Sequence, residues 1–584
     1  IIMSIFKDII TILRREDKIK FLFLFFLILL NVFLEMIGIG LIFPILGFLV
    51  SDKFLLEYSQ YLNILSPLFE INQNNLIIFF SIALIFVFLI KNLITLYLSY
   101  YKYKFTYGLL NYFSEKMYFK YIKKDSLYFL ENNSSIPIRN IDNIGIFTES
   151  LNQFVFILID VIFFVSILTL LFYINFINTM FLLITIFVAL YIFRLLTKKK
   201  LIDLGTQRQF FLQKKIQNVI ETMNAIKEIK IFFREVFFLK KFKNYLEKYS
   251  KTSRIFETYQ SSPKLMLEVL GVFSLASILI INTILNYELD LIVSTIAIFG
   301  ISAIKLLPSL SRMLGSVQFL NHYYPVISTT IDELKKDNAN ESSEKSTEAI
   351  EVKFNNKFKF QDSLEIKNLD FSFGTKKILK NINLKIEKNS IIGIVGKTGS
   401  GKSTLANLIV GLLKPENGKI IFDKKYEILD ALKLNQNLFG YIPQTTFLLD
   451  DTIKKNVTFG QEESEFNSML FWDCLKIARI DTFINSLPDK ENALVGEKGV
   501  KISGGQAQRL GIARAMYRSP DIMILDEATS SLDLETEKDF INSINEIKGK
   551  LTLIIITHRI ASLDICDKIY SIEEGVLRPF EKKI

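Results

Sequence analysis

The stretch Ile391-Ile392-Gly393-Ile394-Val395, followed by Gly396-Lys397-Thr398-Gly399-Ser400-Gly401-Lys402-Ser403, decides the fold of the second half of this chain. The first run predicts a short buried strand, and the residues from Thr404 to Leu412 predict a helix directly after the loop. GxxxxGKS in this strand–loop–helix context is typical of a phosphate-binding loop. Its glycines let backbone N–H groups close around phosphate oxygens, and the helix N-terminus adds partial positive charge. We expect Lys402 to reach the β- and γ-phosphates of a nucleotide and the Ser403 hydroxyl to ligate Mg²⁺.

A second apolar run, Ile522-Met523-Ile524-Leu525, ends in the acidic pair Asp526 and Glu527. Two acids at the end of a strand can simply cap a helix. Beside a phosphate loop, however, the pattern favours Asp526 as a holder of Mg²⁺ and Glu527 as the general base that polarises the attacking water.

The segments around these motifs resemble the nucleotide-binding domain of ABC transporters. Ile502-Ser503-Gly504-Gly505-Gln506 precedes the acidic pair, Ser531-Leu532-Asp533 follows it, and His558 closes the apolar run Leu553–Thr557. The order and spacing match that family from about 350 to 580. With apolar helices ahead of this domain, the chain resembles a type I ABC exporter half-transporter.

The resemblance implies roles for the matching residues. Phe373 would stack on adenine, and Gln444 would sense Mg²⁺ and signal to the membrane domain. Ser503 and Gly505 would clamp the γ-phosphate of a nucleotide held by an opposite subunit. The expected catalytic residues are Glu527, His558 and Gln444, and the expected Mg²⁺ ligands are Ser403, Gln444 and Asp526. The expected ATP-binding residues are Phe373, Gly396, Lys397, Thr398, Gly399, Ser400, Gly401, Lys402, Ser403, Thr404, Ser503, Gly504, Gly505, Gln506 and Asp533.

The composition of the whole chain excludes several classes of protein. The chain has 584 residues, of which 50% are hydrophobic, and the mean hydropathy is +0.31. Its two cysteines, Cys474 and Cys566, exclude a disulfide framework and a cysteine-rich metal module. The net charge of +10 is interpreted as lysine-rich cytoplasmic loops, and no nucleic-acid partner is expected.

Long apolar runs before about residue 315 predict six transmembrane helices. One lies in Phe21–Val50 and one in Asn75–Tyr100, and each is long enough to cross a hydrocarbon core of about 30 Å. Leu151–Phe193 is long enough for two helices that turn near 173–178, and Leu265–Met313 for two that divide near 286–290. The expected fold is therefore a six-helix transmembrane α domain followed by an α/β P-loop NTPase domain.

The distribution of lysines predicts the orientation of these helices. The segments 101–125 and 198–254 are rich in lysine, whereas the loop 51–70 has more acids than lysines. Positive loops stay in the cytoplasm, so we expect both termini there. The cytoplasmic loops near 129–145 and 222–236 are expected to contact the nucleotide-binding domain. The predicted domains are 1–331 for the membrane part, 332–351 for a linker and 352–584 for the nucleotide-binding part.

Each complete ATP site in this family needs two such domains face to face, so a chain with one domain must pair. The intact Glu527 and Ser503–Gln506 string favour a homodimer with two active sites. A heterodimer with a degenerate second site is the alternative.

Four cations in or at the ends of the predicted helices are the candidate substrate residues: Lys91, Lys264, Lys305 and Arg312. Intramembrane charges are energetically unfavourable and therefore point to function. Snorkelling, or salt bridges with Glu35 or Glu268, is the alternative. Several cations in one cavity would suit a phosphate- or pyrophosphate-bearing substrate.

A second resemblance concerns the cargo. The stretches 33–44, 264–268 and 294–309 are similar to the lipid-linked oligosaccharide flippase of bacterial N-glycosylation. The four cations fall at matching places, and 51–70 would form an amphipathic external helix. The resemblance implies a bacterial inner-membrane flippase for a polyprenyl-pyrophosphate-linked glycan. The alternatives are an exporter of another lipid, a peptide or a drug, and a membrane-tethered ATPase that transports nothing.

Overall fold

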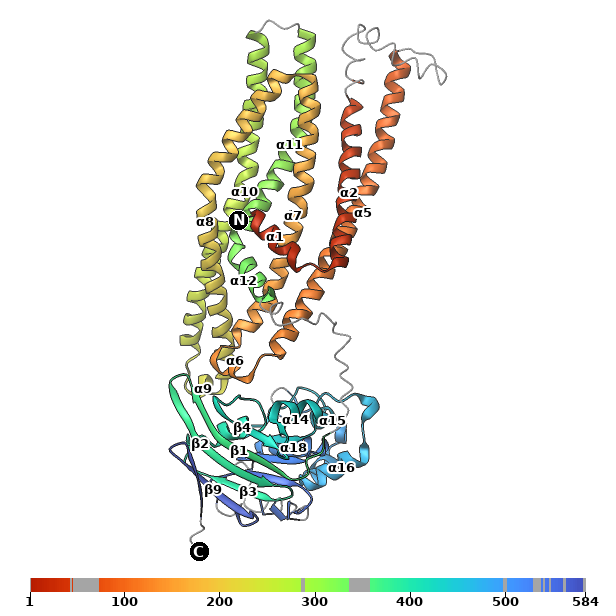
Figure 1. Cartoon of the computed structure of the whole chain (residues 1–584). Coiled ribbons are helices and arrows are strands. Elements are labelled where there is room, and N and C mark those ends of the chain that lie inside the picture. Colours follow the sequence, from red (N-terminus) through yellow and green to blue (C-terminus); the bar gives the residue numbers. More distant parts are fainter. Residues whose placement is uncertain are drawn as a thin grey trace. The chain divides into compact units, whose positions relative to one another are not determined.

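The computed structural model of the chain describes residues 2–42, 45, 73–284, 289–335, 358–496, 501–528, 537–538, 541–542, 544–545, 548–559 and 563–580. The chain forms two compact units (Figure 1). The first contains Ile1–Lys124 and Asn132–Glu344, and the second contains Asp125–Glu131 and Lys345–Ile584.

The first unit consists of helices. These are α1 (Ile2–Ile12), α2 (Arg15–Gly40), α5 (Gln73–Ile122), α7 (Ser135–Ile174), α8 (Phe176–Asn224), α9 (Ile226–Ile231), α10 (Glu235–Ile284), α11 (Leu289–His322) and α12 (Tyr324–Lys335). Among the described residues, six helices are long and apolar enough to cross a membrane: α2, α5, α7, α8, α10 and α11. The predicted number of spans is therefore confirmed.

Several of these helices are much longer than a bilayer requires. At about 1.5 Å per residue, the 50 residues of α5 extend roughly 75 Å, more than twice a hydrocarbon core of about 30 Å. The apolar part of α5 lies in its first half, and its second half carries lysines and tyrosines of the segment 101–125, which is predicted to be cytoplasmic. The predicted turn near 173–178 lies at Asn175, whose side chain accepts a hydrogen bond from the backbone N–H of Asn178 and so caps α8.

Three predicted features lie wholly or partly outside the described residues. They are the external helix at 51–70, part of the turn near 286–290, and the linker at 332–351 beyond residue 335. Helix α12 continues to Lys335, four residues into that predicted linker. The predicted boundary after residue 351 stays a prediction.

The second unit is built on two sheets. The four-stranded sheet has the order β2-β1-β4-β5, with β1 (Ser363–Phe373), β2 (Lys376–Glu387), β4 (Asn417–Phe422) and β5 (Tyr426–Glu427). The six-stranded sheet has the order β10-β9-β3-β8-β7-β6, with β3 (Ile391–Val395), β6 (Phe439–Ile442), β7 (Ile522–Asp526), β8 (Thr552–Ile556), β9 (Lys568–Glu573) and β10 (Val576–Pro579). All neighbours from β9 to β6 are parallel, and β10 is antiparallel.

Helices cover this unit and complete the expected α/β fold. They are α6 (Ser126–Glu131), α13 (Lys402–Ile409), α14 (Ile428–Leu434), α15 (Ile453–Thr458), α16 (Ser468–Ile477), α17 (Asp481–Ser486) and α18 (Gly504–Tyr517). Helix α6 belongs to this unit although it lies between α5 and α7 in sequence. Leu127 packs against the apolar core of the unit, and Asp125 pairs with Lys414 at 3.0 Å.

The central strands explain why the sheet is buried on both sides. Ile522 and Ile524 of β7 pack into one apolar cluster with the four-stranded sheet, and Met523 and Leu525 pack into another with α16 and α18. Since successive side chains of a strand point to opposite faces, a continuous apolar run fills both clusters. The polar residues that follow these strands then gather at one edge of the sheet.

Candidate nucleotide-binding site and membrane charges

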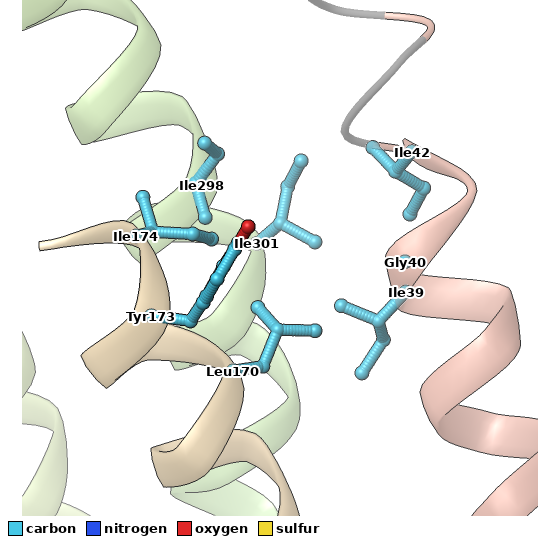
Figure 2. A pocket seen from close by; sticks show the side chains of 8 residues that line it. All are labelled: Ile39, Gly40, Ile42, Leu170, Tyr173, Ile174, Ile298 and Ile301. Carbon is cyan, nitrogen blue, oxygen red and sulfur yellow. The ribbon is translucent and has the colours of Figure 1, made fainter. Parts of the chain in front are cut away.

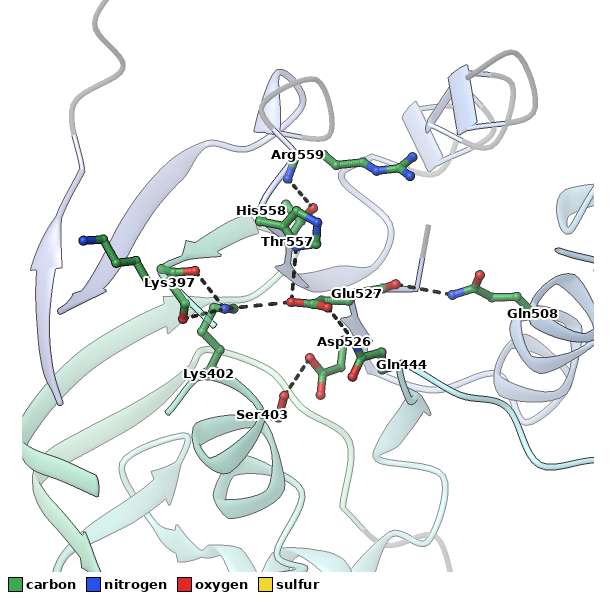
Figure 3. Close-up of polar contacts among 11 residues, drawn as sticks. Lys397, Lys402, Ser403, Gln444, Gln508, Asp526, Glu527, Thr557, His558 and Arg559 are labelled. Atoms are coloured by element: carbon green, nitrogen blue, oxygen red, sulfur yellow. Dashed lines mark hydrogen bonds and ion pairs between the residues drawn. The ribbon is translucent and has the colours of Figure 1, made fainter. Parts of the chain in front are cut away.

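The phosphate loop connects the buried strand β3 to helix α13, as the sequence predicts. Gly399 and Gly401 have φ values of +80° and +105°, a region that side-chain-bearing residues rarely adopt. A Cβ at Gly401 would also lie 2.8 Å from Leu379 of β2. Lys402 begins α13, and its Nζ donates hydrogen bonds to the carbonyls of Gly396 (2.8 Å) and Lys397 (3.2 Å) (Figure 3). The ammonium group therefore lies inside the curve of the loop.

Asp526 ends β7 with both carboxylate oxygens engaged. The Ser403 hydroxyl donates to Oδ1 at 3.2 Å, and the Tyr441 hydroxyl of β6 donates to Oδ2 at 3.3 Å. The residue is 2% exposed, and this burial raises the pKa of its carboxyl group against the opposing effect of the two hydrogen bonds. The hydroxyl and the carboxylate that the sequence assigned to Mg²⁺ are thus adjacent.

Glu527 is the point where several strand ends converge. Gln444 Nε2 donates to Oε2 at 2.7 Å, His558 Nδ1 lies 3.3 Å from Oε1, and Lys402 Nζ lies 3.8 Å from Oε1. Figure 3 shows these side chains pointing at Glu527 from different segments. The backbone φ of Glu527 is +51°, a strained value for a residue with a side chain. The three predicted catalytic residues therefore lie together.

The Ser503–Gln506 string lies at the start of α18. The Ser503 hydroxyl accepts from the Gln506 backbone N–H at 3.2 Å, and the Gln506 side chain accepts from the Ser503 backbone N–H at 2.8 Å, which is a capping box. Gly504 is exposed, and Gly505 is half-buried. In the described part of the chain, no hydrogen bond or ion pair joins these residues to the phosphate loop.

Other predicted nucleotide contacts are less closely tied to the loop. Phe373 is half-buried at the end of β1 and meets Phe371 edge-on, with ring centroids 4.9 Å apart. Thr404 follows Ser403 in the first turn of α13 and is half-buried. Asp533 lies outside the described residues.

The residues present fit a nucleotide and a magnesium ion. The Ser400 hydroxyl is buried within the loop and has no hydrogen-bond partner, so a phosphate oxygen there would satisfy it. Ser403 and Asp526 offer the oxygen ligands that Mg²⁺ prefers. Gln444, which the sequence analysis placed among the Mg²⁺ ligands, instead donates to Glu527 in this structure.

The four predicted substrate cations have different surroundings. Lys305 lies 2.9 Å from Glu35, and Lys91 pairs with the same carboxylate, so the salt-bridge alternative holds for both lysines. Arg312 lies 2.7 Å from Asp160, which is 1% exposed and also accepts from Ser309.

Lys264 differs from the other three cations. It is exposed on α10 and makes no ion pair among the described residues. Glu268, the other predicted acid partner, is likewise exposed on α10 without an ion pair in the described part of the chain.

Sequence reasoning missed two contributors to these sites. The hydrogen bond from the Tyr441 hydroxyl to Asp526 was not predicted, although Tyr441 lies three residues before Gln444. The pairing of Asp160 with Arg312 was also missed. Tyr441 and Asp160 each place a polar group in an apolar run, and a buried polar group needs a partner. This requirement is the signal by which the two contacts could have been predicted.

Comparisons with known proteins agree with this geometry. Residues 379–530 match the family model described as ABC transporter. A putative export ATP-binding/permease protein of Rickettsia bellii is 42% identical over 223 residues, which are 37% of each chain. A multidrug resistance ABC transporter ATP-binding and permease protein of Lactococcus lactis subsp. lactis is 34% identical over 279 residues, 46% of each chain. These matches thus span less than half the length of either relative.

A solved structure extends the likeness to the whole fold. A bacterial Atm1-family ABC exporter with ATP bound aligns with a TM-score of 0.75 at 18% identity, covering 96% of this chain and 95% of that one. Six membrane-capable helices precede a domain that matches the ABC transporter model, and the chain has the fold of an ABC exporter.

Proposed function

We propose that this chain is one half of an ATP-driven exporter in a bacterial inner membrane, with both termini in the cytoplasm. It works as a homodimer that hydrolyses ATP at the interface between its two nucleotide-binding domains. The observation that carries the proposal is the convergence of Lys402, Gln444 and His558 on Glu527, next to the Ser403–Asp526 pair.

The chemistry follows from the positions of these groups. Lys402 and the backbone N–H groups of the phosphate loop hold the phosphates, and Mg²⁺, when bound at Ser403 and Asp526, neutralises phosphate charge. Glu527 takes a proton from water at one carboxylate oxygen. His558 and Gln444 hold that carboxylate in place. The Ser503–Gln506 string of a second copy closes the site, since no hydrogen bond or ion pair joins this string to the phosphate loop of its own domain in the described residues.

Helix α6 supports a route from this site to the membrane helices. It lies between α5 and α7 in sequence and packs with the nucleotide-binding unit through Leu127 and the Asp125–Lys414 pair. ATP-driven closure of two such units would therefore pull on the ends of α5 and α7. The predicted second contact near 222–236 would act in the same way on α8 and α10.

Glu527→Gln tests the catalytic assignment. Reconstituted in nanodiscs, the variant should bind ATP with unchanged affinity and lose at least about 99% of its hydrolysis, because removal of a general base typically lowers rates 10²–10⁴-fold. Glu573→Gln, at an exposed position at the end of β9, is the matched control and should retain full activity. Hydrolysis by Glu527→Gln at a near wild-type rate would refute the proposal, and so would a chain that stays monomeric with every nucleotide.

For the cargo we propose a polyprenyl-pyrophosphate-linked oligosaccharide. Two lysines share the single carboxylate of Glu35, and the positive charge that remains supports this choice, as do the flippase-like stretches of the sequence. In proteoliposomes, lipid-linked oligosaccharide should stimulate ATP hydrolysis and the free glycan should not. The Lactococcus relative is named a multidrug resistance transporter, which favours a drug as the second candidate. Stimulation by hydrophobic drugs in the same assay would select it. Hydrolysis that no added substrate changes would favour a membrane-tethered ATPase.

A further inference from the structure

Three charged side chains from three helices of the first unit meet at one place. Nζ of Lys305 on α11 lies 2.9 Å from Oε1 of Glu35 on α2, and Nζ of Lys91 on α5 pairs with the other carboxylate oxygen. The side chains are 34%, 9% and 14% exposed, respectively. One carboxylate thus serves two ammonium groups. The cluster carries one positive charge that no acid within it balances.

Phe88 on α5 gives this cluster an aromatic wall. Its ring centroid lies 5.5 Å from Nζ of Lys91 and 5.6 Å from Nζ of Lys305, within cation–π distance of both. Gly38 of α2 makes room for the ring, because a Cβ there would lie 2.9 Å from it. The ring face carries only partial negative charge, so the ring does not cancel the excess positive charge of the cluster.

An apolar pocket of about 190 Å³ is lined by residues of α2, α7 and α11, and two of these helices also carry Glu35 and Lys305. Ile39 of its wall follows Glu35 by one helical turn on α2, and Ile301 precedes Lys305 by one turn on α11; residues so spaced share a helix face. Leu170 of α7 faces Ile39 across the pocket (Figure 2). A charged site and an apolar site are therefore adjacent along α2 and α11.

We propose that Glu35 is a built-in counterion that sets the affinity of Lys91 and Lys305 for an anion. The anion is the head group of the transported amphiphile, whose apolar part enters the neighbouring pocket. The inference rests on the proposed function, because it states how the transport site selects its cargo. A phosphate head is attracted by the unbalanced lysine charge and repelled by Glu35. Glu35 therefore weakens anion binding, and when no substrate is present it offsets the repulsion between the two lysines that it pairs with.

Charge arithmetic within the cluster makes this testable. The wild-type cluster has two lysines and one carboxylate. Glu35→Gln leaves both lysines unbalanced, and Lys91→Gln leaves no net charge. The double variant Glu35→Gln/Lys91→Gln returns to the wild-type net charge with different side chains. Glu268→Gln is the matched control, since Glu268 is exposed on α10 and has no ion pair among the described residues.

The chain is measured in phosphatidylcholine nanodiscs, and ATP hydrolysis is followed while a polyprenyl phosphate is added. Glu35→Gln should lower the polyprenyl phosphate concentration that gives half-maximal stimulation of ATP hydrolysis roughly tenfold, and Lys91→Gln should raise it by a similar factor. The double variant and Glu268→Gln should remain near the wild-type value. A polyprenol of the same chain length, which lacks the phosphate, should give no shift in any variant.

Three results would overturn the counterion role. The half-maximal concentration of polyprenyl phosphate could be the same for Glu35→Gln as for the wild type, or polyprenol could produce an equal shift. The double variant could also keep the half-maximal concentration of Glu35→Gln. Thermal unfolding of each variant distinguishes these three results from misfolding. If repulsion between the lysines unfolds Glu35→Gln, the double variant still tests the proposal. Wild-type hydrolysis that neither probe alters would contradict the proposed cargo class. Absence of hydrolysis in the wild type would contradict the proposed exporter function itself.

Discussion

Replacing Tyr441 with phenylalanine removes one hydroxyl from the magnesium side of the nucleotide site. The ring packs against the apolar core of the second unit, and phenylalanine keeps that packing. The lost hydroxyl is the donor to Oδ2 of Asp526, whose other oxygen accepts from Ser403. The substitution therefore leaves a 2% exposed carboxylate with one donor instead of two. We predict that Tyr441 positions Asp526 for Mg²⁺.

The size of the effect follows from the geometry. A hydrogen bond to a charged group contributes about 1.5–3 kcal/mol. The O···O distance of 3.3 Å is longer than the usual 2.5–3.0 Å range for such bonds, so the lower end applies. A loss of about 1.5 kcal/mol corresponds to roughly a tenfold weaker affinity. The Mg²⁺ concentration that gives half of the Mg²⁺-dependent gain in ATP affinity should rise by about that factor.

The assay measures binding rather than turnover. In a Glu527→Gln background, ATP affinity is determined across a Mg²⁺ titration and again with EDTA. Tyr441→Phe should shift the Mg²⁺ midpoint roughly tenfold and leave the EDTA value unchanged. Tyr570→Phe on β9, a half-buried tyrosine that packs against the same core, is the matched control. An unchanged Mg²⁺ midpoint, or an equal loss of affinity in EDTA, would refute the positioning role.

Three further predictions concern stability and reactivity. Asp160→Ala should lower the free energy of unfolding by about 1–3 kcal/mol, because the buried Ser309 hydroxyl and the Arg312 guanidinium lose a charged acceptor. Lys264→Ala, at an exposed position, should cause no comparable change in a thermal melt. Gly401→Ala should weaken ATP binding and destabilise the domain by about 1–3 kcal/mol, and equal binding to the wild type would contradict this. Burial raises the pKa values of Cys474 and Cys566 to about 12, so both thiols should resist maleimide at pH 8 until denaturant is added. Because the pKa of each thiol rises from 9.0 to about 12 on folding, the stability that depends on the protonated thiols is fully present below about pH 9 and is lost as the pH rises toward 12. Rapid labelling of the native chain at pH 8 would disprove the burial argument.

The phosphate loop and the acidic pair could be predicted because their geometry is local. The positive φ values at Gly399 and Gly401 require glycine at fixed places in a short segment. The strand before the loop and the strand before Asp526 are recognisable from continuous apolar runs. The number of membrane-capable helices follows from hydropathy in the same way.

The partners of the intramembrane charges could not be predicted with the same certainty. Glu35 and Glu268 were equal candidates for pairing with the lysines, and the structure joins both lysines to Glu35. Only the last three residues of helix α6, 129–131, fall within the loop near 129–145 that was expected to contact the nucleotide-binding domain. Helix α6 belongs to the second unit because Leu127 packs against the core of that unit, and no local sequence pattern predicts this packing.

By itself, the sequence determined where a nucleotide can bind and how many helices can cross a bilayer, because both depend on neighbouring residues. Only the tertiary structure decided which distant groups meet. Lys305 and Glu35 are 270 positions apart, and Tyr441 and Asp526 are 85 apart. Such meetings depend on how helices and strands align against one another, and a shift of one residue turns a side chain to another face. The charge of the membrane cluster and the support of the magnesium ligand are therefore properties of the fold.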